Sequence, residues 1–237
     1  MLFENRADLI IDLLAKENTV SIQGFVDKLG VSESTIRRDL IALEEAGQLR
    51  RIHGGATSIS EIGKEQKMSQ KENLNLDAKK EVAKYAATLV KPDSQIYVDA
   101  GTATLELIRI LPNNIRLQIV TNGIDQALLA VQRGLSVTLL GGEVKPNTHA
   151  IAGISAYQQL HKMNFSHSFL GMNGLHEVHG LTTTNMDEAL LKELAMQQSQ
   201  NIRILMDHSK VNEVYEFKVE APSQAIILLD EASHSQK

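Results

Sequence analysis

The sequence predicts an α/β protein in two parts, an N-terminal winged helix-turn-helix and a larger C-terminal α/β domain. Apolar residues within the first 46 positions recur every three or four residues, which is the period of amphipathic helices. A short alternating segment with a Gly-Gly pair follows and predicts a β-hairpin. From residue 78 onwards, short apolar segments alternate with helical ones, which is typical of a largely parallel sheet covered on both faces.

Composition indicates a folded, soluble protein. The chain has 237 residues, of which 43% are hydrophobic, enough for one large core or two unequal ones. The sequence contains no run of about 18 apolar residues, which is the length needed to span a bilayer. Its N-terminal residues also lack the pattern of a signal peptide. The absence of cysteine excludes disulfides and thiolate metal sites. We therefore expect a cytoplasmic protein that does not associate with membranes.

The first 46 residues predict three helices. Residues 3–16 form an amphipathic helix, because their leucine and isoleucine residues share one face. Ser21 is placed to cap a second helix that ends at Gly30. Ser32 is placed to cap a third helix, which runs to about Ala46. The tight turn between the second and third helices is typical of a helix-turn-helix.

A wing and a linker follow the helices. Residues 48–52 alternate like a strand, and Gly54-Gly55 permits a turn into residues 56–59. Residues 58–77 are polar and have no clear period, so we expect a linker that is partly helical at most. The predicted DNA-binding domain therefore covers residues 1–57, and the α/β domain covers residues 78–237.

Basic residues near the predicted helix-turn-helix are clustered, although the whole chain carries a net charge of -5. Arg37 and Arg38 are adjacent on the third helix, and Arg50 and Arg51 are adjacent in the wing. The third helix turns Ser34 and Arg38 away from its apolar stripe, where a recognition helix meets the major groove. The alternative is a solvated surface on which Asp39, Glu44 and Glu45 balance the two arginines.

The C-terminal part predicts six strands and four helices. The strands are expected at residues 96–99, 117–121, 137–140, 165–170, 202–206 and 225–229. The helices are expected at residues 79–90, 104–111, 124–133 and 186–198.

Polar motifs follow several of these strands. Asp99, Gly101, Thr102 and Thr104 lie between a strand and a helix, where backbone N–H groups and the helix dipole favour an anion. The ends of parallel strands meet at one edge of a sheet, where ligands bind. The other candidates at this edge are Thr121, Asn122, Gly141, Gly142, Asn173 and Lys210. On the helix at 186–198, Glu188 and Lys192 are one turn apart and predict an i,i+4 ion pair.

These motifs resemble the DeoR family of transcriptional regulators. The stretches VSESTIRRDL at 31–40 and RIHGGA at 51–56 are similar to its DNA-binding signature, with similarity over residues 6–57. The similarity to its sensor domain extends over residues 78–230. The residues that carry this similarity are 101–104, 121–122, 141–142, 171, 173–174, 188–189 and 207–210. Segments 71–80 and 171–174 are similar to repressors of the lactose and tagatose pathways.

The resemblance implies a repressor of a carbohydrate-catabolism operon whose sensor domain has the fold of ribose-5-phosphate isomerase and binds a phosphorylated sugar. The implied partners are operator DNA, this effector, and further copies of the chain in a dimer or tetramer, with no cofactor. The implied DNA-binding residues are Ser32, Ser34, Thr35, Arg37, Arg38, Arg51, His53 and Gly54. For His53, a turn residue packed against the wing is an equal alternative.

The sequence departs from the family pattern at several points. Gly24 lies inside the second helix and should cost about 1 kcal/mol relative to alanine. Ala103 replaces the second hydroxyl residue of the usual Gly-Thr-Thr run, and Val211 stands where phenylalanine is frequent. The chain also ends soon after Asp230. These departures affect the expected effector fit and oligomer contacts more than DNA binding.

Three other functions are compatible with parts of the sequence. A phosphosugar isomerase would use Asp99 or Glu188 to move a proton and Lys210 to stabilise an enediolate, but the winged helix argues against an enzyme. A metal site could use His176 and His179, but the sequence lacks a complete ligand framework, so we expect no metal. A regulator of this kind could also act as an activator.

Overall fold

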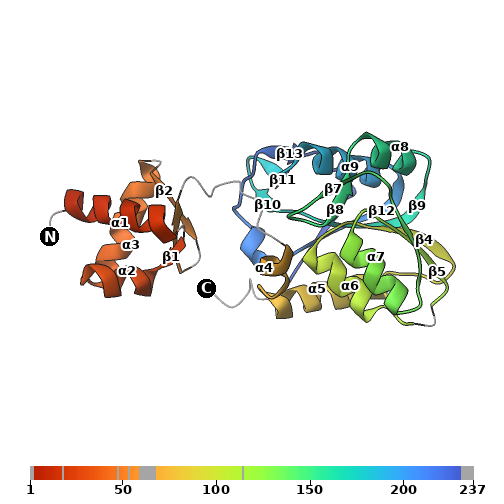
Figure 1. Cartoon of the computed structure of the whole chain (residues 1–237), viewed down its shortest axis with the longest axis horizontal. Coiled ribbons are helices and arrows are strands. Elements are labelled where there is room, and N and C mark those ends of the chain that lie inside the picture. The colour runs from red at the N-terminus through yellow and green to blue at the C-terminus, as the bar shows by residue number, and fades with distance from the viewer. Residues whose placement is uncertain are drawn as a thin grey trace. The chain divides into compact units, whose positions relative to one another are not determined.

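The computed structural model describes residues 3–17, 19–46, 48–52, 54–58, 68–113 and 115–230. The chain divides into two units, Met1–Lys64 and Glu65–Lys237 (Figure 1). Part of the expected linker is regular structure, because β3 ends at Ser58, α4 covers Met68–Glu72 and α5 begins at Leu76. Residues 59–67 of that linker lie outside the described residues.

The N-terminal unit has the predicted winged helix-turn-helix fold. Its elements are α1 (Phe3–Glu17), β1 (Thr19–Ser21), α2 (Ile22–Leu29), α3 (Glu33–Glu45), β2 (Leu49–Ile52) and β3 (Gly55–Ser58). The three strands form one antiparallel sheet in the order β1-β3-β2. Strand β1 was not predicted, because three residues are too few to show an alternating pattern.

The three helices pack through the apolar stripes that the sequence predicts. Ile10, Phe25 and Ile36, one from each helix, are fully buried together in this core. A buried ion pair also joins α1 to α3: Arg6 donates through Nε and Nη2 to the two carboxylate oxygens of Asp39, at 2.6 and 2.9 Å. Asp39 therefore does not belong to a solvated surface that balances the arginines of α3, as one alternative supposed.

Serine side chains cap α2 and α3 as predicted. Ser21 Oγ accepts a hydrogen bond from the Gly24 N–H at 3.0 Å, and Ser32 Oγ accepts one from the Thr35 N–H at 3.3 Å. A Cβ atom at position 24 would lie only 3.1 Å from a Val20 methyl carbon. The close approach of β1 to the first turn of α2 therefore leaves little space for a side chain at this helical position.

Removing the cap of α2 should loosen that helix. We expect Ser21→Ala to lower its local stability by about 1 kcal/mol, because the Gly24 N–H loses its acceptor. Amide hydrogen exchange in α2 should then be roughly fivefold faster, while exchange in the C-terminal unit stays the same. Unchanged exchange in α2 would show that the cap contributes nothing.

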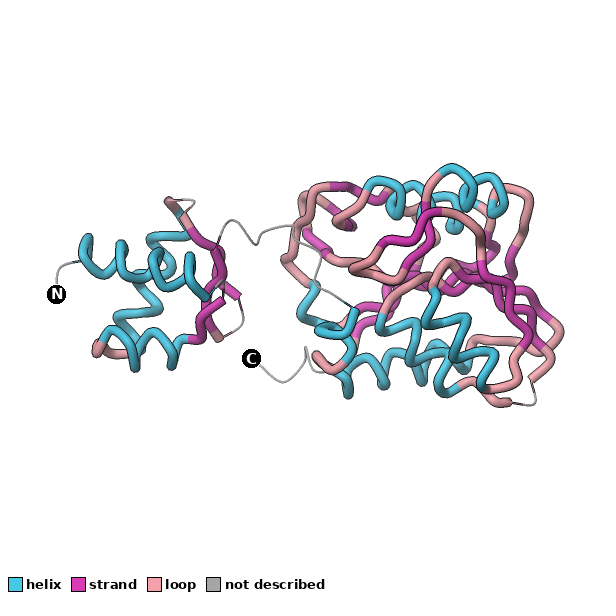
Figure 2. The backbone as a smooth tube through the Cα atoms, in the orientation of Figure 1, coloured by secondary structure: helices cyan, strands magenta, loops and turns pink. Residues whose placement is uncertain are grey.

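The C-terminal unit is built on a six-stranded, fully parallel sheet in the order β14-β12-β9-β4-β5-β6. Figure 2 shows strands of this unit in magenta between helices in cyan. Its strands are β4 (Ser94–Val98), β5 (Leu117–Thr121), β6 (Ser136–Leu139), β9 (Phe165–Gly171), β12 (Ser199–Met206) and β14 (Ile226–Leu229). Each predicted strand is present, with ends shifted by up to three residues.

Helices cover both faces of this sheet. One face carries α5 (Leu76–Thr88), α6 (Thr102–Ile110) and α7 (Ile124–Gln132). The other carries α8 (Ile154–Leu160) and α9 (Met186–Gln197), as Figure 1 shows. A hydrophobic core lies on each face of the sheet, and strand β4 contributes side chains to both. Ile96 and Val98 pack towards the first set of helices, and Tyr97 packs towards the second.

Short elements that the sequence did not reveal lie beside the sheet. They are β7 (Glu143–Lys145) paired with β8 (Ala150–Ala152), the strands β10 (Gly174–His176), β11 (Gly180–Thr183) and β13 (Phe217–Val219), and the 3-10 helix η2 (His208–Lys210). Within the described ranges, the chain has no helix of the length and hydropathy that crossing a membrane requires.

Candidate functional site

The start of α3 presents three hydroxyl groups. Ser32 Oγ lies 3.0 Å from Ser34 Oγ and 2.8 Å from Thr35 Oγ1. Ser32 and Ser34 are exposed, and Thr35 is half-buried. The first turn of the predicted recognition helix therefore offers a group of donors and acceptors that can exchange their mutual contacts for base edges or phosphates.

The two arginines of α3 are in different situations. Arg37 donates from Nε and Nη2 to a carboxylate oxygen of Glu33, at 2.9 and 2.6 Å, along the exposed surface of the helix. Arg38 is exposed, and none of the described residues forms an ion pair or hydrogen bond with its guanidinium. Arg38 can therefore reach a ligand without first leaving a partner inside the protein.

The wing carries the remaining predicted DNA contacts. Arg51 donates from its backbone N–H and its Nε to the carboxylate of Glu44, at 2.8 and 2.6 Å, which fastens β2 to α3. Gly54 is exposed and has a φ of 82°, a left-handed conformation that favours glycine at the hairpin turn. His53 lies outside the described residues, so neither alternative for it is tested.

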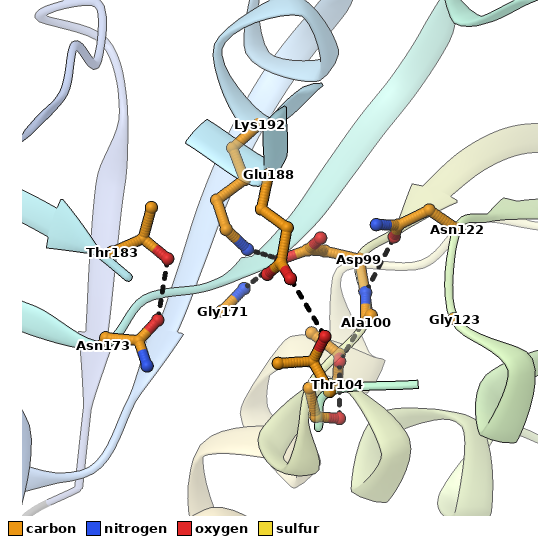
Figure 3. Close-up of polar contacts among 12 residues, drawn as sticks. Asp99, Ala100, Thr104, Asn122, Gly123, Gly171, Asn173, Thr183, Glu188 and Lys192 are labelled. Atoms are coloured by element: carbon orange, nitrogen blue, oxygen red, sulfur yellow. Dashed lines mark hydrogen bonds and ion pairs between the residues drawn. The ribbon is translucent and has the colours of Figure 1, made fainter. Parts of the chain in front are cut away.

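The second candidate site lies in the C-terminal unit, at the edge where the six parallel strands end, here called the rim. Asp99 follows β4, Asn122 follows β5, and Asp207 follows β12. Asp99 is almost fully buried and accepts hydrogen bonds from Lys192 Nζ and from the Gly171 N–H, the latter at 3.1 Å (Figure 3). The buried carboxylate thereby ties β4 to both β9 and α9.

The predicted i,i+4 ion pair between Glu188 and Lys192 is not formed. Lys192 pairs with Asp99 instead, and Glu188 accepts a hydrogen bond from Thr148 Oγ1 at 2.9 Å. Glu188 and Lys192 are both buried between α9 and the sheet, where contacts with other elements decide the pairing. Figure 3 shows the two side chains directed from α9 towards the rim.

Three predicted contact residues are used inside the protein. Thr104 Oγ1 donates to the Asp99 and Gly101 carbonyl oxygens at 2.6 and 2.9 Å, Thr121 Oγ1 accepts from the Gly123 N–H, and Asn122 Oδ1 accepts from the Ala100 N–H. All three side chains are buried. Their burial and internal bonds suit a role in shaping the loops of the rim better than the direct ligand contact predicted from sequence.

The predicted glycines and Asn173 also make specific contacts. Both backbone polar groups of Gly141 bond the side-chain amide of Gln159, at 3.1 and 3.0 Å. Gly142 approaches the Ala152 carbonyl oxygen so closely that a Cβ atom would lie 2.6 Å from it. Asn173 Oδ1 accepts from Thr183 Oγ1 at 2.8 Å, which joins the loop after β9 to the end of β11.

Helix α6 begins at the rim without a side-chain cap. Its N-cap residue is Gly101, which has no side chain to accept a hydrogen bond from the first backbone N–H groups of the helix, those of Thr102 and its neighbours. Thr102 itself is half-buried. An uncapped helix start with an adjacent hydroxyl is a common anion-binding arrangement, so Gly101 and Thr102 stay predicted effector-binding residues.

Four lysines surround the same rim: Lys71, Lys79, Lys192 and Lys210. Burial lowers the pKa of Lys71 to about 7, and the positive charges of Lys210, Lys192 and Lys79 add to the effect. Burial also lowers the pKa of Lys79, against the opposing attraction of Asp207. Lys210 was predicted as a site residue. Lys71 was missed, because its polar segment shows no period and was interpreted as a linker.

Tyr97 is a second residue that sequence reasoning missed. Its side chain is fully buried in β4, and no described residue forms a hydrogen bond with its hydroxyl. Burial raises its pKa well above the usual value, and the nearby carboxylates of Asp99 and Glu188 raise it further. In sequence, Tyr97 has the character of an ordinary core residue, so nothing indicated a place beside the buried carboxylates.

Histidines do not assemble a metal site in the described part of the chain, where no group of three or more potential ligands comes together. The rings of His176 and His179 lie 5.0 Å apart. His176 Nδ1 accepts from the Val178 N–H at 3.1 Å. This histidine therefore has a structural role in the turn between β10 and β11.

Comparison with known proteins identifies both units. Residues 6–62 match the family described as DeoR-like helix-turn-helix domain, and residues 74–231 match the DeoR C terminal sensor domain. The chain is 42% identical to the uncharacterised HTH-type transcriptional regulator FruR of Bacillus subtilis, over 90% of this chain and 85% of that protein. It is 35% identical to the lactose phosphotransferase system repressor of Staphylococcus aureus, over 87% of this chain and 83% of that protein.

Solved structures give a more distant likeness. Ribose 5-phosphate isomerase A of Methanocaldococcus jannaschii aligns with a TM-score of 0.43 and 19% identity, over 58% of this chain and 55% of that protein. A likeness of this size bears on neither activity nor ligand.

Proposed function

The chain belongs to the DeoR family of transcriptional regulators of sugar metabolism, and from that membership we propose that it represses a carbohydrate-catabolism operon until a phosphorylated sugar binds. The family consists of regulators, not of enzymes, so the isomerase alternative is set aside. One relative is named as a repressor of a lactose phosphotransferase system, which supports the direction of control and the connection with sugar uptake.

The start of α3 supports the proposed DNA contact. Ser32, Ser34, Thr35 and Arg38 lie together on its exposed side, at the end of a recognition helix that enters the major groove. Arg37, Arg51 and Gly54 are proposed to contact the backbone or flanking bases from α3 and the wing. A single winged helix touches too few bases to select one site in a genome, so the protein should act as a dimer or tetramer on repeated half-sites.

The observation that supports the effector class best is the combination of cations and the uncapped start of α6 at the rim. Lys210 and the uncapped start of α6 at Gly101 and Thr102 provide charge and N–H groups for a phosphate. The half-buried Asn173 offers an amide group for sugar hydroxyls, and the buried Asp99 is proposed to hold Lys192 and Gly171 in place beside the effector. Thr104, Thr121, Asn122, Gly141 and Gly142 are proposed to hold the loops that carry these groups.

Binding of the effector would then act on the DNA through the relative placement of the two units. If only the unliganded protein holds both winged helices at the spacing of the half-sites, an effector that favours another placement lowers operator affinity. The effector can lower the operator affinity by no more than the ratio of its own affinities for the two placements.

The proposed function is tested by selecting duplexes from a random pool with the full-length protein and then titrating phosphorylated hexoses and trioses. We expect one preferred sequence, with half-sites repeated at a fixed spacing, and one sugar phosphate that releases it. Transcription in vitro from a promoter carrying that sequence distinguishes a repressor from an activator. Failure of every duplex to exceed competitor DNA would contradict the proposal.

Lys210→Ala should weaken the response to the effector without affecting DNA affinity. Losing one charge-assisted contact to phosphate corresponds to about 1.5–3 kcal/mol, or roughly a tenfold to hundredfold higher effector concentration for half release. The measurement is a titration of labelled operator release. Lys162→Ala, which removes an exposed lysine at the end of α8, is the matched control. If the Lys210 variant and the unmodified chain release the operator at the same effector concentration, Lys210 is not part of the effector site.

A further inference from the structure

The short helix α4 is fastened to the C-terminal unit at its first residue. The Met68 N–H donates to the Asn147 carbonyl oxygen at 2.7 Å, and Met68 is buried. Asn147 lies in the turn between β7 and β8, next to Thr148, whose hydroxyl bonds the buried Glu188. The first residue of α4 and a carboxylate near the rim are therefore linked through two adjacent residues of one turn.

The other end of α4 is held over the rim itself. Lys79 Nζ, on α5, donates to the carbonyl oxygen of Lys71. Asn75, in the turn between α4 and α5, donates from Nδ2 to Asp207 Oδ1 at 2.9 Å. These contacts hold the end of α4 against α5 and beside Asp207, which follows β12, and Lys71 is half-buried there.

Lys71 faces charged groups from three elements. Lys79 belongs to α5, Lys210 to η2, and Glu188 and Lys192 to α9. Lys192 is neutralised by its ion pair with Asp99, so Lys210 is the principal like charge near Lys71, and its repulsion adds to the larger effect of burial. A phosphate placed between these two ammonium groups would replace repulsion by attraction at both.

We propose that Lys71 is an anion-binding residue of the effector site, and that α4 thereby couples effector occupancy to the chain segment that leads to the DNA-binding unit. The proposal rests on the proposed function and adds to it a residue outside the set predicted from sequence. Helix α4 is the first described element after residues 59–67, the segment that leads to the DNA-binding unit.

The first test measures binding of inorganic phosphate to the full-length protein by calorimetry. Lys71→Ala should bind phosphate at least tenfold more weakly than the unmodified chain, and Lys71→Arg should stay within about threefold, because it keeps the charge. Lys84→Ala, which removes an exposed lysine on α5, should bind normally. Equal binding by Lys71→Ala and the unmodified chain would overturn the proposal.

The pH dependence of the same measurement separates Lys71 from the other cations. Since the pKa of Lys71 is about 7 without ligand, the ammonium form that binds phosphate is lost as the pH rises. Between about pH 7.5 and 8.5, where phosphate itself is mostly dianionic, affinity should fall several-fold, up to about tenfold. Lys71→Arg should abolish most of this slope, because arginine stays charged. An identical slope in that variant would contradict the assignment.

Hydrogen exchange tests the coupling separately from the ligand contact. Phosphate should slow amide exchange in Met68–Glu72 of the unmodified chain but not of Lys71→Ala. If no sugar phosphate releases the selected duplex, yet phosphate binding and α4 protection depend on Lys71, the proposed function fails and the anion site stands. If a sugar phosphate releases the duplex equally well from Lys71→Ala, the inference fails and the proposed function stands.

Discussion

Replacing Lys192 by methionine should destabilise the C-terminal unit by about 3–5 kcal/mol, because it leaves the carboxylate of Asp99 buried without its cation. The Gly171 N–H, at 3.1 Å, would be the main remaining donor to that carboxylate. Methionine has nearly the volume of lysine, so loss of charge rather than a cavity dominates the change.

Urea unfolding followed by tyrosine fluorescence measures this effect in the full-length chain. All four tyrosines lie at positions 85, 97, 157 and 215, and the chain has no tryptophan, so the signal reports on the C-terminal unit alone. Lys162→Met is the matched control. The double variant Lys192→Met with Asp99→Asn should recover much of the stability, because the buried charge is gone. No recovery would show that packing, not charge, is responsible.

Replacing Arg38 by alanine should weaken binding to the selected duplex by roughly fivefold to 150-fold for each half-site that the protein occupies. The reason is the loss of one arginine–base contact, which corresponds to about 1–3 kcal/mol for each half-site. Discrimination at one base pair should relax in parallel, whereas loss of a backbone contact would weaken all sequences alike. Effector affinity should not change.

Fluorescence anisotropy with matched and single-mismatch duplexes distinguishes the loss of a base contact from the loss of a backbone contact. Arg37→Ala should have a smaller effect, because the Arg37 guanidinium already contacts Glu33 and must give up that pair to reach DNA. Arg116→Ala, an exposed arginine of the C-terminal unit, controls for the loss of one positive charge. Full affinity in Arg38→Ala would refute its assigned role.

The sequence predicts the fold well because burial patterns and caps are local. Ser21 and Ser32 mark helix starts that the structure reproduces, and the apolar runs of the parallel strands reflect burial on both faces. Three-residue strands such as β7 and β8 were missed, because they are too short to carry a period. Helix α4 was missed as a fixed element because its position depends on distant groups, Asn147 and Lys79 among them.

The candidate site could be predicted only in part, for the same physical reason. Strand ends identify the rim, but sequence spacing paired Lys192 with Glu188, whereas the structure pairs it with Asp99, 93 residues away. A weak i,i+4 interaction on a helix surface gives way to a buried contact once the helix packs on a sheet. Likewise, the hydroxyls of Thr104 and Thr121 suggest ligand contacts in sequence, yet both groups complete the loops that carry them.

The central claim is that one chain couples operator DNA to an anionic effector. Thermodynamic linkage makes this testable by one quantity, the calorimetric affinity of the releasing sugar phosphate, measured with the free protein and with the protein saturated by operator. We expect the effector to bind the DNA complex more weakly, by about 5-fold to 150-fold, and by the same factor with which it weakens DNA binding. Equal effector affinity in the two states would contradict the account.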